Sequence, residues 1–198
     1  MDYRKLTDSI EFYFPMVRYN KIMFILKTKR LVLRNLVPKD WKLFYELMEE
    51  PETKYYMDDY LEAATEECAR RWVGERISYN NEIPRHSYNL AIEFKGEPIG
   101  WIGIGEAESE EKKDLDFGYA LKKSYWGKGF MTEALRALLK YCFKTMEIEK
   151  ITGECETRNL ASRKVMEKAG MTLEKRFSVK DKKTGQKKEK FRFFIERS

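Results

Sequence analysis

The sequence is poor in the residues that bind metal ions and form disulfides. Its 198 residues include one histidine and three cysteines, and no two cysteines have the spacing C-x-x-C. A structural zinc site takes four cysteine or histidine ligands, and a disulfide framework takes an even number of cysteines. We therefore expect no metal site, and we expect Cys68, Cys142 and Cys155 to be buried or half-buried thiols.

Long apolar runs are also missing. The run Ile22–Leu26 near the start is flanked by lysines and is far shorter than the ~18–20 residues of a membrane-spanning helix. The first residues lack the basic, apolar and small-residue order of a secretory signal. These absences predict a soluble, cytoplasmic protein with no membrane partner.

Enough hydrophobic residues remain to build the core of one domain. Hydrophobic residues make up 42% of the chain and aromatic residues 14%, which excludes a wholly disordered chain. The net charge is +6, and much of the positive excess lies between Lys180 and Lys190. We interpret that stretch as the solvated tip of a hairpin, and the alternative is an RNA-binding patch.

We divide the chain into an aromatic-rich N-terminal extension, residues 1–27, and a single domain, residues 28–198. Met16 and Met23 are alternative starts of the chain. The extension is therefore either a start assigned too early or an accessory segment packed on the domain.

Hydrophobic periodicity predicts the elements of the domain. Strands are expected at residues 31–36, 88–94, 98–104, 115–121, 151–155, 171–179 and 191–195. Helices are expected to begin near Pro38, Thr65 and Phe130, with a further helix at residues 160–168. This order is typical of an α+β protein whose sheet is mainly antiparallel, with parallel pairing around the long helix after Gly129.

One strand-to-helix turn, Gly127-Lys128-Gly129, has the composition of an anion site. The first amide groups of a helix have no partner within the helix and lie at the positive end of its dipole. The glycines allow a close approach of the backbone, and Lys128 adds a positive charge. The turn therefore predicts binding of a phosphate or diphosphate, although a tight turn that binds nothing has the same pattern. The dinucleotide pattern G-x-G-x-x-G fails because Thr132 takes the place of the last glycine, and the P-loop pattern fails because Phe130 follows Gly129.

Segments on both sides of this turn resemble one known family. Residues 26–34 are LKTKRLVLR, residues 125–134 are YWGKGFMTEA, and residues 159–171 are NLASRKVMEKAGM. In this order and at these spacings they resemble the RimJ/RimL-type branch of the GNAT acetyltransferases. The sequence departs from the wider superfamily pattern at Trp126, where a polar residue is usual, and at Met131, where a small residue is usual.

The resemblance implies the GNAT fold, a mixed twisted sheet with a splay between its two central parallel strands and helices on both faces. It implies an acetyl-CoA-dependent N-acetyltransferase that needs no metal, in which a primary amine attacks the acetyl group directly in a ternary complex. One strand would pair with the pantetheine arm, and amides of the turn at 127–132 would hold the diphosphate. The cofactor-binding residues that the resemblance implies are Tyr119, Ala120, Leu121, Trp126, Gly127, Lys128, Gly129, Phe130, Met131, Thr132, Asn159 and Ser162.

Ser162 and Asp116 are the expected catalytic residues. The resemblance places Ser162 near the thioester sulfur, where its hydroxyl would hydrogen-bond the leaving thiolate; its alternative role is to cap the helix after Asn159. The amine must lose a proton before it attacks, and Asp116 is the candidate base. Asp181 in the last hairpin is a second candidate, and for both carboxylates the alternative is a solvated surface position. His86 has no evident partner and is not expected to act as the base.

The acceptor pocket is expected to come from residues 55–60, YYMDDY, and from the last hairpin. Aromatic and acidic side chains suit a cationic amine, although core tyrosines and a capping aspartate would give the same pattern. The resemblance favours a protein N-terminal α-amine over a polyamine or an aminoglycoside. The alternative of another class is a non-catalytic RNA- or ribosome-associated module on the same scaffold. As an enzyme the protein would not require nucleic acid and would be a monomer or a homodimer.

Overall fold

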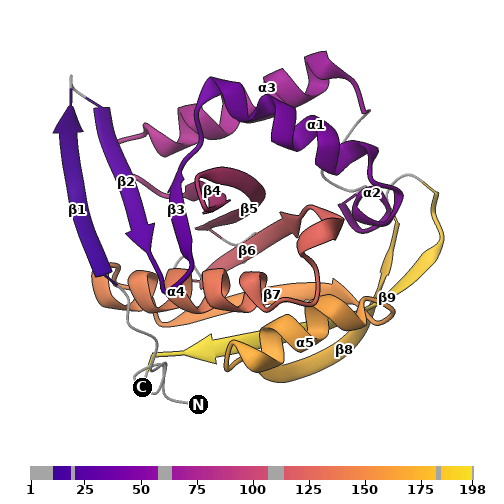
Figure 1. Ribbon diagram of the computed structural model, residues 1–198. Coiled ribbons are helices and arrows are strands. Elements are labelled where there is room, and N and C mark those ends of the chain that lie inside the picture. The colour runs from indigo at the N-terminus through magenta and orange to yellow at the C-terminus, as the bar shows by residue number, and fades with distance from the viewer. Residues whose placement is uncertain (1–10, 19–20, 58–63, 107–113, 182–183, 198) are drawn as a thin grey trace.

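A mixed sheet of nine strands organises the residues that this computed structural model describes, 11–18, 21–57, 64–106, 114–181 and 184–197 (Figure 1). The strand order is β1-β2-β3-β4-β5-β6-β7-β9-β8. β6 and β7 are parallel, and the other neighbouring strands are antiparallel. The strands are β1 (Glu11–Arg18), β2 (Lys21–Lys27), β3 (Leu31–Asn35), β4 (Tyr88–Phe94), β5 (Glu97–Glu106), β6 (Asp114–Leu121), β7 (Lys150–Glu156), β8 (Thr172–Lys180) and β9 (Lys187–Glu196).

Helices cover both faces of this sheet. α1 and α3 lie over one face and α4 and α5 over the other (Figure 1). The α-helices are α1 (Trp41–Glu49), α2 (Pro51–Met57), α3 (Glu66–Asn80), α4 (Phe130–Thr145) and α5 (Leu160–Lys168), and the 3-10 helices are η2 (Pro38–Asp40) and η3 (Lys123–Tyr125). The predicted fold class, with helices on both faces of a mixed sheet, is confirmed.

Strand alternation separates the core into two layers. Leu90 and Ile92 of β4 join the layer under α4, whereas Ala91 between them faces α1 and α3. The rings of Phe44 and Trp72, with centroids 4.1 Å apart, fill that second layer. Successive strand residues point to opposite faces, so each central strand serves both layers.

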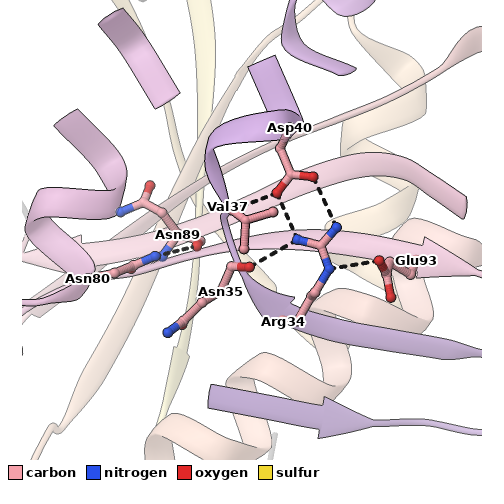
Figure 2. Close-up of polar contacts among 7 residues, drawn as sticks. All are labelled: Arg34, Asn35, Val37, Asp40, Asn80, Asn89 and Glu93. Carbon is pink, nitrogen blue, oxygen red and sulfur yellow. Dashed lines mark hydrogen bonds and ion pairs between the residues drawn. The ribbon is translucent and has the colours of Figure 1, made fainter. Parts of the chain in front are cut away.

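Arg34 joins β3 to the start of α1 (Figure 2). Its guanidinium donates to both carboxylate oxygens of Asp40, at 2.7 and 3.0 Å, and to Glu93 of β4 at 2.7 Å. Beside this group, the Asn80 side chain and the Asn89 backbone exchange two hydrogen bonds. These contacts hold α1 and α3 on their face of the sheet.

The two parallel strands separate soon after they begin to pair. β6 and β7 have only three paired positions, and the last pairs Asp116 with Thr152. β6 nevertheless continues to Leu121, where its other edge still pairs with Gly100 of β5. The predicted splay is therefore present. It leaves one edge of β6 without a strand neighbour among the described residues.

The strands and helices predicted from residue 31 onward are all present, with bounds that differ by a few residues. The sequence analysis did not assign β1, β2 or α2. Phe24 and Leu26 alternate along β2 and are buried under α4, but residues 22–26 are all apolar, so no alternation is visible there. α2 begins at Pro51, a residue suited to the first turn of a helix, and is too short to show a helical period. The division into residues 1–27 and 28–198 stays a prediction.

Candidate active site

A cavity of about 660 Å³ lies between the end of β6 and the helices α2, α4 and α5. It includes all the predicted cofactor-binding residues except Lys128. Its lining residues are Glu52, Thr53, Tyr56, Met57, Tyr119, Ala120, Leu121, Tyr125, Trp126, Gly127, Gly129, Phe130, Met131, Thr132, Arg158, Asn159, Leu160, Ala161, Ser162, Lys164, Val165 and Lys168.

The turn before α4 adopts a conformation that favours glycine. Gly127 and Gly129 have φ angles of +73° and +76°, in the left-handed region that side chains rarely enter. Gly129 is the N-cap of α4 and has no side chain to accept a hydrogen bond from the first-turn amides. Those amides therefore lack the usual capping partner beside the cavity, as an anion site requires.

Two side chains of this segment, Trp126 and Lys128, hydrogen-bond to neighbouring backbone carbonyl groups and so hold the turn in place. The indole Nε1 of Trp126 donates to the carbonyl oxygen of Leu121 at 2.7 Å, which ties the turn to the end of β6. The ammonium of Lys128 donates to the Ser124 carbonyl oxygen at 2.8 Å. Lys128 therefore braces the turn from outside the cavity lining, and its predicted contact with the phosphate stays a prediction.

Asp116 lies at the fork of the splay and outside the cavity lining. It is half-buried, and burial raises the pKa of its carboxyl group to about 6, against an opposing hydrogen bond from the Phe117 amide. Because side chains alternate along β6, Asp116 shares the face of Gly118 and Ala120, which is the α1 and α3 face. The carboxyl group thus has a pKa close to neutral pH at the point where the strands part.

Asn159 and Ser162 lie together at the start of α5. The side-chain oxygen of Asn159 caps the helix by accepting a hydrogen bond from the Ser162 amide at 2.9 Å. The Ser162 carbonyl oxygen accepts a hydrogen bond from the hydroxyl of Tyr119 at 3.3 Å, which joins α5 to β6 across the splay. Both predicted residues therefore line the cavity where the free edge of β6 faces α5.

α2 contributes Glu52, Thr53, Tyr56 and Met57 to the cavity wall, and Tyr55 lies beside them outside the lining. The Tyr55 and Tyr56 side chains are 47% and 38% exposed and their rings meet edge to face. The Tyr55 hydroxyl lies 3.4 Å from a carboxylate oxygen of Glu156, and Glu52 pairs with Lys123 at 3.1 Å. α2 therefore connects the two sides of the splay. Positions 58–60 of the predicted acceptor segment lie outside the described residues.

The structure does not bring Asp181 or His86 to the cavity. Asp181 pairs with Lys188 at 2.5 Å and accepts a hydrogen bond from the Thr184 amide, within the last hairpin. His86 pairs with Glu106 at 2.9 Å on an exposed surface. Neither residue lines the cavity.

Three basic residues of the lining were missed by the sequence analysis: Arg158, Lys164 and Lys168. Lys164 and Lys168 are one helical turn apart on α5, on the face that also carries Ala161 into the cavity. That spacing was a usable signal, because residues four apart lie on the same side of a helix.

The cysteines are free thiols, as predicted. Cys142 and Cys155 are buried and Cys68 is half-buried. Burial raises the pKa of Cys155 to about 11, so this thiol is protonated at neutral pH.

Among the described residues, no three histidine, cysteine or acidic side chains gather as metal ligands would. No helix in that part of the chain is long and apolar enough to cross a membrane.

Comparison with known proteins connects this geometry to a family. The family model "Acetyltransferase (GNAT) domain" matches residues 30–172. The chain belongs to the GNAT acetyltransferase family. Its sequence is 30% identical over 147 residues to that of the uncharacterized N-acetyltransferase YnaD of Bacillus subtilis. This match covers 74% of the present chain and 82% of YnaD. The predicted enzyme class, N-acetyltransferase, is confirmed.

Solved structures show the same fold. An acetyltransferase (GNAT family) from Bacillus anthracis has a TM-score of 0.74 and 25% identity, over 87% of this acetyltransferase and 98% of that chain. RimL, the ribosomal L7/L12 alpha-N-protein acetyltransferase, has a TM-score of 0.75 and 20% identity, over 91% and 98% of the two chains. The resemblance to the RimJ/RimL-type branch is thus confirmed at the level of the fold. Structures of this fold include complexes with coenzyme A and with acetyl-CoA.

Proposed function

We propose that this acetyltransferase moves the acetyl group of acetyl-CoA to the α-amine of a protein N-terminus. The observation that carries the proposal is a single cavity lined by two chemically different groups. The uncapped amides after Gly129 line one part of it, and Tyr56 and Glu52 of α2 line another. An anionic donor and a cationic acceptor would meet between them, beside the free edge of β6.

The donor half of the cavity fits acetyl-CoA in three respects. The whole cavity, with a volume of about 660 Å³, is in the range of small-molecule sites. The amides at 130–132 and the lysines of α5 offer charge and hydrogen bonds to phosphates. The edge of β6 from Tyr119 to Leu121 has no β7 neighbour, so the backbone groups that face this edge, apart from the Leu121 carbonyl oxygen bound by Trp126, are available to the amides of a pantetheine arm.

The catalytic proposal assigns roles to Ser162 and Asp116. The nitrogen of the neutral amine forms a bond to the acetyl carbon, and the carbon–sulfur bond breaks to release the CoA thiolate. The Ser162 hydroxyl hydrogen-bonds this thiolate, because a serine is too weak an acid to transfer its proton fully. Before the attack, the ammonium of the bound acceptor passes one proton to the Asp116 carboxylate through water, since Asp116 lies outside the cavity lining. The second proton, which the nitrogen loses after the attack, is taken up by the released thiolate. A base whose pKa is about 6 is mostly ionised at neutral pH and can accept the first proton.

The chemistry of α2 supports a cationic acceptor. The exposed ring of Tyr56 lines the cavity, and aromatic faces attract ammonium groups. Glu52 lines the same wall, and an acceptor cation would share its carboxylate with Lys123. Two structures of the same fold are described as enzymes that modify a ribosomal protein, one as acting on the α-amine of L7/L12 and one on its N-terminal serine. We therefore favour a peptide N-terminus over a polyamine or an aminoglycoside.

A panel of N-terminal peptides, polyamines and aminoglycosides, each incubated with acetyl-CoA and assayed for thiol release, tests the proposal. We expect turnover with peptides that have a free α-amine and none with the same peptides after N-terminal blocking. Turnover with polyamines alone would overturn the acceptor assignment. Thermal stabilisation by a nucleic-acid duplex, with no stabilisation by CoA, would instead indicate a non-catalytic module.

Two glycine variants test whether CoA binds at the turn before α4. Gly129→Trp should abolish CoA binding, because a side chain is strained at φ +76° and its Cβ would lie 3.6 Å from Arg30 Nη2, so that the bulky ring would displace the turn whose amides face the cavity. Gly96→Trp is the matched control, since Gly96 also has a positive φ, +84°, but lies in the β4–β5 hairpin with open space around it. Unchanged CoA affinity in Gly129→Trp would show that the donor site is elsewhere.

A further inference from the structure

Glu133, in the first turn of α4, receives three hydrogen bonds from the residues just before β3. Thr28 Oγ1 donates to one carboxylate oxygen at 2.6 Å, and the Arg30 backbone amide donates to the same oxygen at 2.8 Å. Arg30 Nε donates to the other oxygen at 2.6 Å. Burial acts to raise the pKa of Glu133, but these bonds and the Arg30 charge outweigh it and lower that pKa. The carboxylate is therefore held ionised at the start of α4, where a negative charge is favourable.

The same arginine also contacts the turn that precedes α4. Arg30 Nη1 donates to the Lys128 carbonyl oxygen at 3.0 Å, and the guanidinium lies 4.4 Å from the centre of the Phe130 ring. Arg30 Nη2 lies 3.6 Å from the position that a Cβ on Gly129 would occupy. One side chain therefore contacts Lys128 before Gly129, Phe130 after it, and Glu133 in the first turn of the helix.

The turn needs such an external support. Two of its residues, Gly127 and Gly129, are in the left-handed region, and glycine loses more conformational freedom on ordering than any other residue. The helix N-cap is itself one of these glycines and supplies no side-chain hydrogen bond. Without the arginine, the amides would have to be ordered when the ligand binds, at a cost to affinity.

We infer that Arg30 is a positioning residue for the diphosphate: it fixes the turn at 127–132 through Glu133 and the Lys128 carbonyl group, so that the amides face the cavity before the ligand arrives. The inference rests on the proposed function, because it takes the diphosphate of acetyl-CoA as the anion. It assigns a role to the Thr-x-Arg segment that precedes β3, which lies 103 residues from its partner Glu133 in the sequence. It also predicts which part of the ligand depends on Arg30.

The test compares CoA, which has the diphosphate, with pantetheine, which lacks it. We expect Arg30→Gln to bind CoA about tenfold more weakly, the size of one charge-assisted hydrogen bond, and to bind pantetheine as the wild type does. Glu133→Gln should show the same selective loss. Calorimetry gives both dissociation constants, and a melting curve without ligand reports whether either variant is misfolded. A misfolded variant would lose affinity for both ligands alike.

Two further variants complete the design. Arg30→Lys keeps the charge but cannot donate to Glu133 and to the Lys128 carbonyl group together, so it should lose as much CoA affinity as Arg30→Gln. Arg70→Gln is the matched control, since Arg70 also pairs with a glutamate, Glu66, and stacks on an aromatic ring, but on α3 away from the cavity. Equal loss of CoA and pantetheine in a variant that melts as the wild type does, or wild-type CoA affinity in Arg30→Gln or in Arg30→Lys, would overturn the inference. If the wild-type protein binds no CoA, it is the proposed function that fails.

Discussion

The side-chain oxygen of Asn159 accepts the hydrogen bond of the Ser162 amide over 2.9 Å, so Asn159 is the N-cap of α5. The sequence left open whether Ser162 itself caps this helix. The structure gives that task to Asn159, which is a favoured N-cap residue. The Ser162 hydroxyl lines the cavity and has no hydrogen-bond partner within the part of the chain that the structure describes. It is therefore available to a ligand.

Ser162→Ala should consequently lower turnover and leave CoA affinity nearly unchanged. A donor to a developing oxyanion contributes about a hundredfold to a thousandfold to kcat, and we expect no more than the lower end because a thiolate is a weaker hydrogen-bond acceptor than an oxyanion. Steady-state thiol release gives kcat, and calorimetry gives the dissociation constant of CoA. Ser78→Ala, on the exposed part of α3, is the control. Parallel losses of kcat and affinity would make Ser162 a binding residue only.

Asp116→Asn should change how the activity depends on pH. The carboxyl group acts as a base only when ionised, and burial raises its pKa from the ordinary 3.8 to about 6. Wild-type kcat/KM should therefore rise with pH in two limbs, one near pH 6 from Asp116 and one near about pH 8 from the α-amine of the free peptide. The asparagine variant should be slower above about pH 6 and should keep only the limb near about pH 8. A wild-type profile that has only the limb near about pH 8 would remove Asp116 from the mechanism.

The raised pKa of Asp116 also gives a prediction for stability, because the ionised form that activity requires destabilises the folded state. A carboxyl group whose pKa is higher in the folded state stabilises the fold at a pH below its unfolded pKa, and this contribution is lost as the pH rises through the folded pKa. At about pH 8 the wild type thus holds an unfavourable carboxylate, and Asp116→Asn should be more stable by about 2 kcal/mol. The gain should shrink toward about pH 4. Urea unfolding at both pH values measures it, and an equal effect at both would contradict the raised pKa.

Sequence patterns could predict the parts of the fold that depend on neighbours in the chain. The alternation of Leu31 and Leu33 fixed which side of β3 is buried, and both side chains are fully buried. The partners of the nearby arginines could not be predicted in the same way. Arg30 meets Glu133 only because α4 begins beside the end of β2, and Arg34 meets Glu93 only because β3 pairs with β4.

In the candidate site, too, features set by neighbours in the sequence could be predicted, and features set by contacts in the fold could not. The anion-binding turn was predictable because a strand, two glycines and a helix follow one another directly in the sequence. The orientation of Lys128 could not be predicted, since its side chain donates to the Ser124 carbonyl group in a 3-10 helix of three residues, which is too short to show a repeating pattern in the sequence. The α2 wall was partly missed because a helix of seven residues shows too few repeats of an apolar stripe.

The ion pair between Arg34 and Asp40 gives a prediction for folding. The Asp40 side chain is 1% exposed and accepts hydrogen bonds from Arg34 and from the Val37 amide. Arg34→Leu would leave this carboxylate buried without a counter-ion, so it should lower the free energy of unfolding by about 3 kcal/mol.

A second substitution separates charge from packing. Asp40→Asn added to Arg34→Leu removes the buried charge and keeps an acceptor for the Val37 amide, so the double variant should regain more than half of the lost stability. Urea unfolding of the wild type, both single variants and the double variant completes the cycle. No recovery in the double variant would show that Arg34 acts through packing on β4 and not through the charge of Asp40.

Lys164 and Lys168 provide the last prediction, which concerns the other phosphate of the donor. Both side chains line the cavity from α5 and are exposed, and neither has a carboxylate partner in the described ranges. The double variant Lys164→Gln, Lys168→Gln should bind CoA up to about tenfold more weakly than the wild type, and this difference in affinity should narrow as salt is added.

Dephospho-CoA, which lacks the 3′-phosphate, shows which phosphate the two lysines contact. If they contact the 3′-phosphate, the double variant and the wild type should bind dephospho-CoA equally. If instead dephospho-CoA loses as much affinity as CoA, the lysines act on the diphosphate. Lys175→Gln, on the exposed strand β8, is the control for net charge, and a loss of CoA affinity in this control would assign the effect to the overall field of the protein.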